Sequence, residues 1–180
     1  MTEAKVKAHL INILDELGYD FSKFTIDGFA EWIAAWRGRP IEMVRIPLPP
    51  DMFGAWIKSE RTDYIFYDDG PFRVHSIHIL LHELSHVLLN HKTIHVDANV
   101  DILLHHYLRS LDTDGSLATL VTLQGLCRTL KYTDQQELEA ETLSSLTQAR
   151  VFHLAGLDAL TQPSQTPVMH AMVEGLGFDR

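Results

Sequence analysis

The chain has 180 residues, of which 46% are hydrophobic and 22% are charged, so it is long and apolar enough to build one core of its own. This composition argues against intrinsic disorder, and no apolar run approaches the roughly 20 residues that a membrane span requires. Acidic residues outnumber basic residues by 24 to 15, which argues against direct binding of nucleic acid. The single cysteine, Cys127, excludes a disulfide framework and is expected to be buried. Since no targeting signal is evident, we expect a cytoplasmic protein.

The first half of the chain predicts two helices followed by a small sheet. Residues 3–17 and 27–37 each carry an apolar stripe at helical spacing that stops at a glycine. Residues 41–46 are β-prone and precede a proline-rich, non-helical segment. Two further β-prone runs, 55–57 and 64–67, are separated by a polar stretch and predict a hairpin or meander. The sheet is therefore expected to have about three strands.

The second half is predicted to be helical. The expected helices cover residues 71–90, 101–111, 117–130 and 134–154. No internal repeat or second domain is evident. We therefore expect one mainly helical α+β domain over residues 1–160, with the small sheet packed on the helix at 71–90 and a loosely structured tail over residues 161–180.

The sequence His82-Glu83-Leu84-Ser85-His86 is an H-E-x-x-H motif inside the helix predicted at 71–90. Histidines at positions i and i+4 share one helical face, so both imidazoles can reach one Zn²⁺ ion. Glu83 projects about 100° away round the helix, which leaves its carboxylate free to take a proton from water bound to the ion. Zinc lowers the pKa of such water from 15.7 to about 7. The alternative interpretation is a histidine-rich, solvated helix.

A catalytic zinc site needs a third protein ligand, and the nearby His91 does not fit the metzincin pattern. That pattern would require a glycine at Leu89 and a histidine at Lys92. Asp97 and Asp101 are further candidates, although they are more easily explained as a helix cap and an exposed helical position.

Glu137 is the better candidate for the third ligand. It shares a helical face with Glu141, a like-charge pair that is unfavourable unless a positive charge lies opposite. Glu137 would then bind the ion, while Glu141 would accept the outer N–H of a ligand histidine and fix its tautomer. The alternative is that Asp134 and Glu137 form a variant of the helix-capping box.

Three segments, 63–67, 80–91 and 137–141, together resemble the ImmA/IrrE-like metallopeptidase family, with the similarity covering about residues 40–150. The resemblance implies a zincin-like domain of the gluzincin type, with His82, His86 and Glu137 as metal ligands and Glu83 as the base. It also implies a protease that often cleaves a helix-turn-helix repressor encoded beside it.

Other histidines near the motif have open assignments. His75 and His78 fall at helical spacing with the ligand pair, and either line the approach to the metal or are ordinary, partly exposed side chains. Peptide hydrolysis also needs a donor aimed at the developing oxyanion. The sequence does not choose among the candidates for that donor, which are His95, His105, His106 and Tyr132.

The expected function is therefore that of a zinc-dependent peptidase that hydrolyses peptide bonds by metal-activated water. Its expected partner is a protein substrate or regulator, such as a helix-turn-helix transcription factor, rather than nucleic acid or a membrane. One alternative is a non-proteolytic, metal-containing binding module, for example part of a toxin–antitoxin pair. Another is a structural metal site without turnover.

Overall fold

The computed structural model describes residues 2–48, 52–68, 73–96, 102, 123–127 and 130–161. For residues 73–75, 95 and 156–161 it describes the course of the backbone alone. The helix predicted at 101–111, much of the helix predicted at 117–130 and almost all of the tail predicted at 161–180 lie outside these residues.

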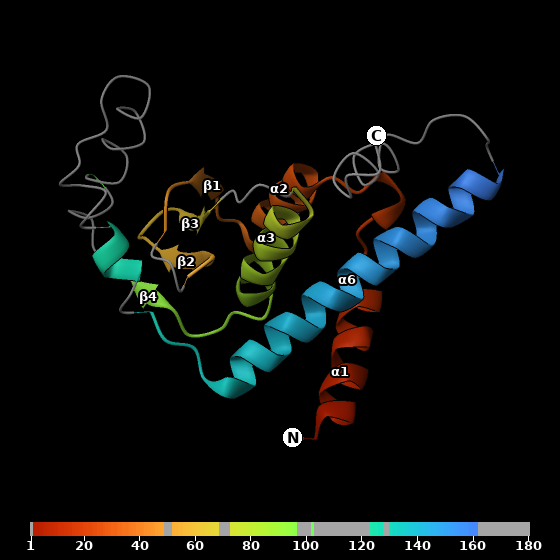
Figure 1. Cartoon of the computed structure of the whole chain (residues 1–180), viewed down its shortest axis with the longest axis horizontal. Coiled ribbons are helices and arrows are strands. Elements are labelled where there is room, and N and C mark those ends of the chain that lie inside the picture. Colours follow the sequence, from red (N-terminus) through yellow and green to blue (C-terminus); the bar gives the residue numbers. More distant parts are fainter. Residues whose placement is uncertain are drawn as a thin grey trace.

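The described part of the chain is mainly helical, with one small sheet, as predicted (Figure 1). The helices are α1 (Glu3–Glu16), α2 (Ile26–Arg37), α3 (Arg73–Leu88) and α6 (Asp134–Thr161), with a short 3₁₀ turn η1 (Phe21–Lys23). The strands are β1 (Ile41–Arg45), β2 (Gly54–Lys58), β3 (Asp63–Tyr67) and β4 (Ile94–His95). Helix α6 runs seven residues beyond the predicted end at Leu154. None of the described helices is long and apolar enough to cross a membrane.

The sheet has the strand order β1-β3-β2-β4. Strands β2 and β3 form the expected antiparallel hairpin, but β1 pairs with β3 in parallel, so the alternative of a meander is wrong. A meander needs a tight turn after β1, and the segment that begins at Pro47 is too rich in proline to provide one between paired strands. The two-residue strand β4 adds a fourth member, paired with Ile57 and Lys58 on the outer edge of β2.

Both faces of the sheet are covered, so its central strands are apolar on both sides. Trp56 and Ile65 belong to the larger core, which they share with the four long helices. On the other face, Ile57 and Phe66 pack in a second core with the helical residues 123–127. Cys127 lies in this second core and is fully buried, as predicted.

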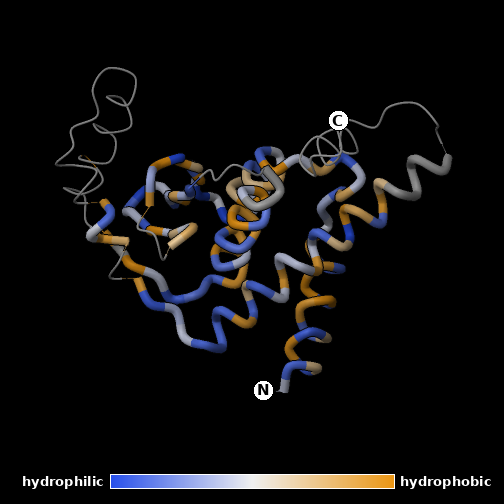
Figure 2. Tube along the Cα trace, in the orientation of Figure 1, coloured by the Kyte–Doolittle hydropathy of each residue, from blue (hydrophilic) through white to orange (hydrophobic). Residues whose placement is uncertain are grey.

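Helix α3 occupies the centre of the molecule, between the sheet and the other helices (Figure 1). It packs against β2 and β3 on one side and against α2 and α6 on the others. Hydrophobic and hydrophilic residues alternate along α1 and α3, as expected for helices with a buried face (Figure 2). The H-E-x-x-H motif is therefore held by rigid elements on several sides.

Candidate metal centre

Helices α3 and α6 bring three potential metal ligands together. His82 and His86 lie one turn apart on α3, and their Nε2 atoms are 3.1 Å from each other. Glu137, in the first turn of α6, places its Oε2 atom 3.2 Å from Nε2 of His82. One donor atom from each of the three residues lies within 4.8 Å of the others. The ligand set predicted from the sequence is thus a spatial cluster that could hold a metal ion.

The separations within this cluster suit a small divalent ion. Two donors bonded to tetrahedral zinc at 2.0–2.1 Å lie about 3.3 Å apart. The two shortest separations in the cluster are close to that value. Two imidazoles and a carboxylate also match the ligand preferences of zinc, although the same set can bind other first-row metals. The structure therefore supports a metal site without fixing the identity of the metal.

The start of α6 leaves Glu137 free for this role. Thr133 precedes the helix; its hydroxyl accepts a hydrogen bond from the backbone N–H of Gln136, and Oε1 of Gln136 accepts one from the backbone N–H of Thr133. This reciprocal pair is a capping box one residue earlier than the alternative predicted from Asp134 and Glu137. Because Gln136 serves the cap, the carboxylate of Glu137 faces the histidines instead.

Glu83 lies beside the cluster, and its side chain is almost completely buried. Burial, and then the charge of Glu137, raises the pKa of its carboxyl from 4.5 to about 8. The backbone N–H of Trp56 in β2 donates a hydrogen bond that partly opposes this rise. The Oε2 atom of Glu83 has no hydrogen-bond partner among the described residues. An orphaned, buried carboxylate oxygen at this position is consistent with a group that works on water or on a cation.

Gly54 allows β2 to approach α3 closely at this point. A Cβ atom on residue 54 would lie 2.7 Å from Oε1 of Glu83 and 2.8 Å from a methyl carbon of Ile79. Only glycine fits between the strand and the helix without displacing one of these side chains.

A cleft of about 450 Å³ opens beside Glu83. The predicted site residues that line it are His78, His82, Glu83, Tyr132, Glu137 and Glu141. Gly54 and its neighbour Phe53 form its β2 side. The candidate metal cluster therefore faces a space large enough for part of a substrate.

Glu141 lies near the outer nitrogen of the candidate ligand His82. Its Oε2 atom is 3.5 Å from Nδ1 of His82 and 3.2 Å from Nε2 of His78. Gln148 in turn places Nε2 3.2 Å from Nδ1 of His78. His78 thus belongs to a polar chain that borders the cluster.

The candidate ligand His86 contacts residues to which the sequence assigned no role. Its Nδ1 atom lies 2.8 Å from Nδ1 of His91, and Nε2 of His91 lies 3.1 Å from Oε2 of Glu139. Burial, together with the nearby rings of His82 and His91, lowers the pKa of His86 from 6.5 to about 2. Burial also lowers the pKa of His91, although Glu139 opposes that shift. His86 is therefore neutral at physiological pH, as a metal ligand must be.

The C-terminal end of α3 explains how His91 returns to His86. Asn90 adopts a left-handed conformation with φ of 50°, and the backbone N–H of His91 donates to the carbonyl of His86 at 3.0 Å. The backbone N–H of Asn90 donates to the carbonyl of Val87 at 3.1 Å. These two bonds form a Schellman motif, which folds the chain back over the last turn of the helix. An asparagine four residues after the motif is the only local signal that could have indicated this turn.

Tyr132 is the one oxyanion candidate whose side chain is described at the cluster. Its ring stacks on the ring of His86 at 3.7 Å between centroids, and its hydroxyl is buried. Burial, and then the charge of Glu83, raises its pKa above the usual value of 10.0, so the hydroxyl keeps its proton. Thr93 is close enough to oppose that shift slightly.

The remaining candidates are not placed by the structure. His105, His106, Asp97 and Asp101 lie outside the described residues, and so do the side chains of His75 and His95.

No model of a protein family, no curated protein and no solved structure matches this chain. The function of the chain is therefore inferred from the geometry of the cluster itself.

Proposed function

We propose that the protein is a zinc-dependent peptidase that hydrolyses a peptide bond in a protein substrate. The observation that carries this proposal is the convergence of His82, His86 and Glu137 beside the buried carboxyl of Glu83. Two imidazoles and one carboxylate form the ligand set of a gluzincin, and a separate acidic group beside them serves as its base. This set is also what the resemblance to the ImmA/IrrE-like family implies.

His82, His86 and Glu137 would hold the ion at the mouth of the cleft. A divalent ion bound there would supply Lewis acidity, both to lower the pKa of water and to polarise a carbonyl. The chain supplies the positions of the reacting groups, since each of these three side chains extends from a packed helix. His86 is fully buried, whereas the side chain of Glu137 is 49% exposed, so the cluster opens towards solvent on the side of α6.

Glu83 would act as the proton carrier. Its carboxylate accepts a proton from the attacking water and later gives it to the nitrogen of the departing amine. A carboxyl with a pKa of about 8 is well suited to the second step, and a cation beside it favours the ionised form required for the first. The hydrogen bond from Trp56 holds the carboxyl in place between β2 and α3.

Tyr132 would stabilise the developing negative charge on the carbonyl oxygen. Its buried hydroxyl keeps its proton and lines the same cleft as Glu83. A donor placed in such a cleft typically contributes about 10²-fold or more to the rate.

The outer edge of β2 supports an extended peptide as the substrate. The carbonyl of Phe53 accepts from the backbone N–H of Asp68 on the β3 side, whereas the backbone of Trp56 bonds to Thr93 and Glu83 on the opposite side. Because backbone groups alternate along a strand, the N–H and C=O of Gly54 also point towards the cleft. An extended chain could pair there by adding a strand. From the family resemblance we propose a helix-turn-helix regulator as its source.

The test combines metal analysis with hydrolysis. Wild type, His82→Ala, Glu83→Gln and the exposed control His153→Ala are loaded with Zn²⁺, dialysed and analysed for bound metal. Each is then incubated with candidate repressor proteins, and the fragments are identified by mass spectrometry. We expect about one zinc per chain except in His82→Ala, and a loss of at least about 10²-fold in cleavage rate for Glu83→Gln.

Two results would reject parts of this proposal. Zinc content well below one per chain in wild type, or unchanged in His82→Ala, would reject the metal site. Full zinc content with fragments that persist in Glu83→Gln would reject the assigned chemistry. Tight binding of a regulator without cleavage would instead favour a metal-containing binding module.

A further inference from the structure

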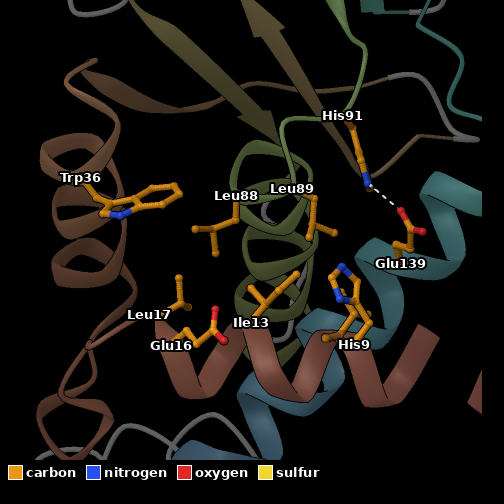
Figure 3. Close-up of a pocket in the computed structure, with 10 residues that line it drawn as sticks. His9, Ile13, Glu16, Leu17, Trp36, Leu88, Leu89, His91 and Glu139 are labelled. Atoms are coloured by element: carbon orange, nitrogen blue, oxygen red, sulfur yellow. Dashed lines mark hydrogen bonds and ion pairs between the residues drawn. The ribbon is translucent and has the colours of Figure 1, made fainter. Parts of the chain in front are cut away.

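A second pocket lies next to the metal centre but shares no lining residue with the cleft. It has a volume of about 480 Å³ and lies between α1, the end of α2, the end of α3 and α6 (Figure 3). His91 and Glu139 form part of its wall, and Figure 3 shows them pointing towards each other at one side of the pocket. The function proposed above gives these two residues no role.

A chain of hydrogen bonds leads from this pocket to the ligand His86. Nε2 of Gln135 donates to Oε1 of Glu139 at 2.6 Å, and Oε2 of the same carboxylate lies 3.1 Å from Nε2 of His91. Nδ1 of His91 lies 2.8 Å from Nδ1 of His86. Each link is short enough to be a real hydrogen bond.

The carboxylate of Glu139 determines which atoms donate and which accept in this series of hydrogen bonds. An ionised carboxylate can only accept, so Nε2 of His91 must carry the hydrogen that it donates to Glu139. A neutral imidazole has one N–H, which leaves Nδ1 of His91 as an acceptor. Nδ1 of His86 must then be the donor in the contact between the two rings. The lone pair of His86 is consequently on Nε2, the atom that faces His82 in the cluster.

We propose that His91 and Glu139 are positioning residues of the metal centre, which fix the tautomer and ring orientation of His86 so that its Nε2 lone pair meets the cation. This inference rests on the proposed metal site. The carboxylate of Glu139 at the end of the hydrogen-bond series also makes His86 a stronger metal ligand, because it stabilises the positive charge that develops on the ring when a metal binds. The Schellman turn at Asn90 supplies the geometry, since it places His91 against the outer face of His86.

Glu139→Gln is the decisive variant, because it keeps the shape of the side chain and removes its charge. The new amide can donate to Nε2 of His91, which would reverse the chain and leave the hydrogen of His86 on Nε2, where it blocks metal binding. We expect the affinity for Zn²⁺ and Co²⁺, measured by competition with a chromophoric chelator, to fall by about 10- to 100-fold. Glu16→Gln makes the same change at an exposed residue of the same pocket and is expected to leave the affinity unchanged.

A second measurement reads the tautomer directly in the metal-free, full-length chain. Long-range ¹H–¹⁵N correlation of the imidazoles distinguishes a ring protonated on Nδ1 from one protonated on Nε2. Wild type is expected to show His86 protonated on Nδ1, with a larger share of the Nε2 form in Glu139→Gln. His91→Phe, which keeps a ring but removes both nitrogens, is expected to weaken metal binding to a similar extent.

The outcomes separate this inference from the proposed function. If wild type binds zinc tightly and Glu139→Gln binds it equally well, the positioning role is wrong while the metal site stands. If wild type binds no metal, the proposed function fails. The tautomer of His86 then decides by itself whether His91 and Glu139 fix the hydrogen on Nδ1 of His86. A wild-type His86 protonated on Nε2 overturns the inference in either case, including when neither variant folds.

Discussion

Replacing Gly54 with alanine tests whether the close approach of β2 to α3 sets the position of Glu83. The added Cβ atom would lie 2.7 Å from Oε1 of Glu83, 2.9 Å from its Cγ and 2.8 Å from Cγ2 of Ile79. Carbon atoms in ordinary contact are 3.5–4.0 Å apart, so the neighbours must move by roughly 1 Å. The strand cannot easily move instead, because β3 pairs with it along all five residues.

This displacement is expected to affect rate more than stability. A catalytic group misplaced by about 1 Å costs about 10²-fold in rate, whereas overpacking costs about 1–3 kcal/mol in the free energy of unfolding. The three atoms nearest to the added Cβ belong to Glu83 and Ile79, and none belongs to the metal cluster. Zinc affinity is therefore expected to stay within a few-fold of the wild-type value.

The assay compares Gly54→Ala with Gly125→Ala, a residue at which an added Cβ meets no atom of the described chain within 4 Å. Zinc affinity, peptide hydrolysis and urea unfolding are measured for both variants and for wild type. If Gly54→Ala hydrolyses and unfolds like Gly125→Ala, Glu83 is not positioned by this contact. A loss of zinc binding in Gly54→Ala would show that the effect spreads beyond Glu83.

Two further predictions concern stability and are measured by urea unfolding of the metal-free protein. Arg37→Met is expected to lower the free energy of unfolding by about 2 kcal/mol, because Arg37 donates to the carbonyl of Val87 at 2.7 Å and pairs with the fully buried Asp63. A loss no larger than that of an exposed control such as Lys23→Met would contradict this prediction. The second prediction concerns pH. His86 alone should make the unfolding free energy fall as pH drops below about 6.5, since the unfolded chain then protonates a histidine that the native pKa of about 2 keeps neutral. Glu83 acts in the opposite sense. Its pKa is about 8 in the native chain and ordinarily 4.5, so between these values the unfolded chain has lost a proton that the native chain keeps. As pH rises from 4.5 to about 8, Glu83 should therefore lower the unfolding free energy by up to about 1.4 kcal/mol per pH unit, which offsets the histidine contribution between pH 4.5 and 6.5. Glu83→Gln should remove the decline between pH 6.5 and 8 and steepen the fall below pH 6.5, and an unchanged pH profile would refute the buried carboxyl.

The sequence predicted the features that depend on local pattern. The boundaries of α1 and α2 follow from apolar stripes that end at glycines, and Gly38 indeed adopts the left-handed conformation of a helix stop, with φ of 66°. The shared face of His82 and His86 follows from the helical repeat. Glu137 could be chosen because a like-charge pair on one helical face calls for a positive partner.

What the sequence left open depends on how elements dock. Nothing local indicates that β1 pairs with β3 in parallel, since this pairing joins strands that are separated by the whole of β2. Glu139 lies about 200° from Glu137 round the same helix, so only the packing of α6 on α3 reveals that both carboxylates reach histidines. The spacing of His91 excludes the metzincin pattern but does not reveal its contact with His86, because that contact is made through the turn at the end of α3.

The two helices that carry the candidate ligands are joined by a long stretch of chain, from His86 to Glu137. An ion bound by both helices would cross-link them and close the intervening chain into a loop. The entropic cost of closing such a loop rises by only about 0.6 kcal/mol each time its length doubles. Insertions or deletions between the helices would therefore change the thermodynamics of assembly very little, provided that α3 and α6 still pack together. Chains with the same centre are thus free to differ widely in the length of this interval, and a search by fixed spacing would overlook them.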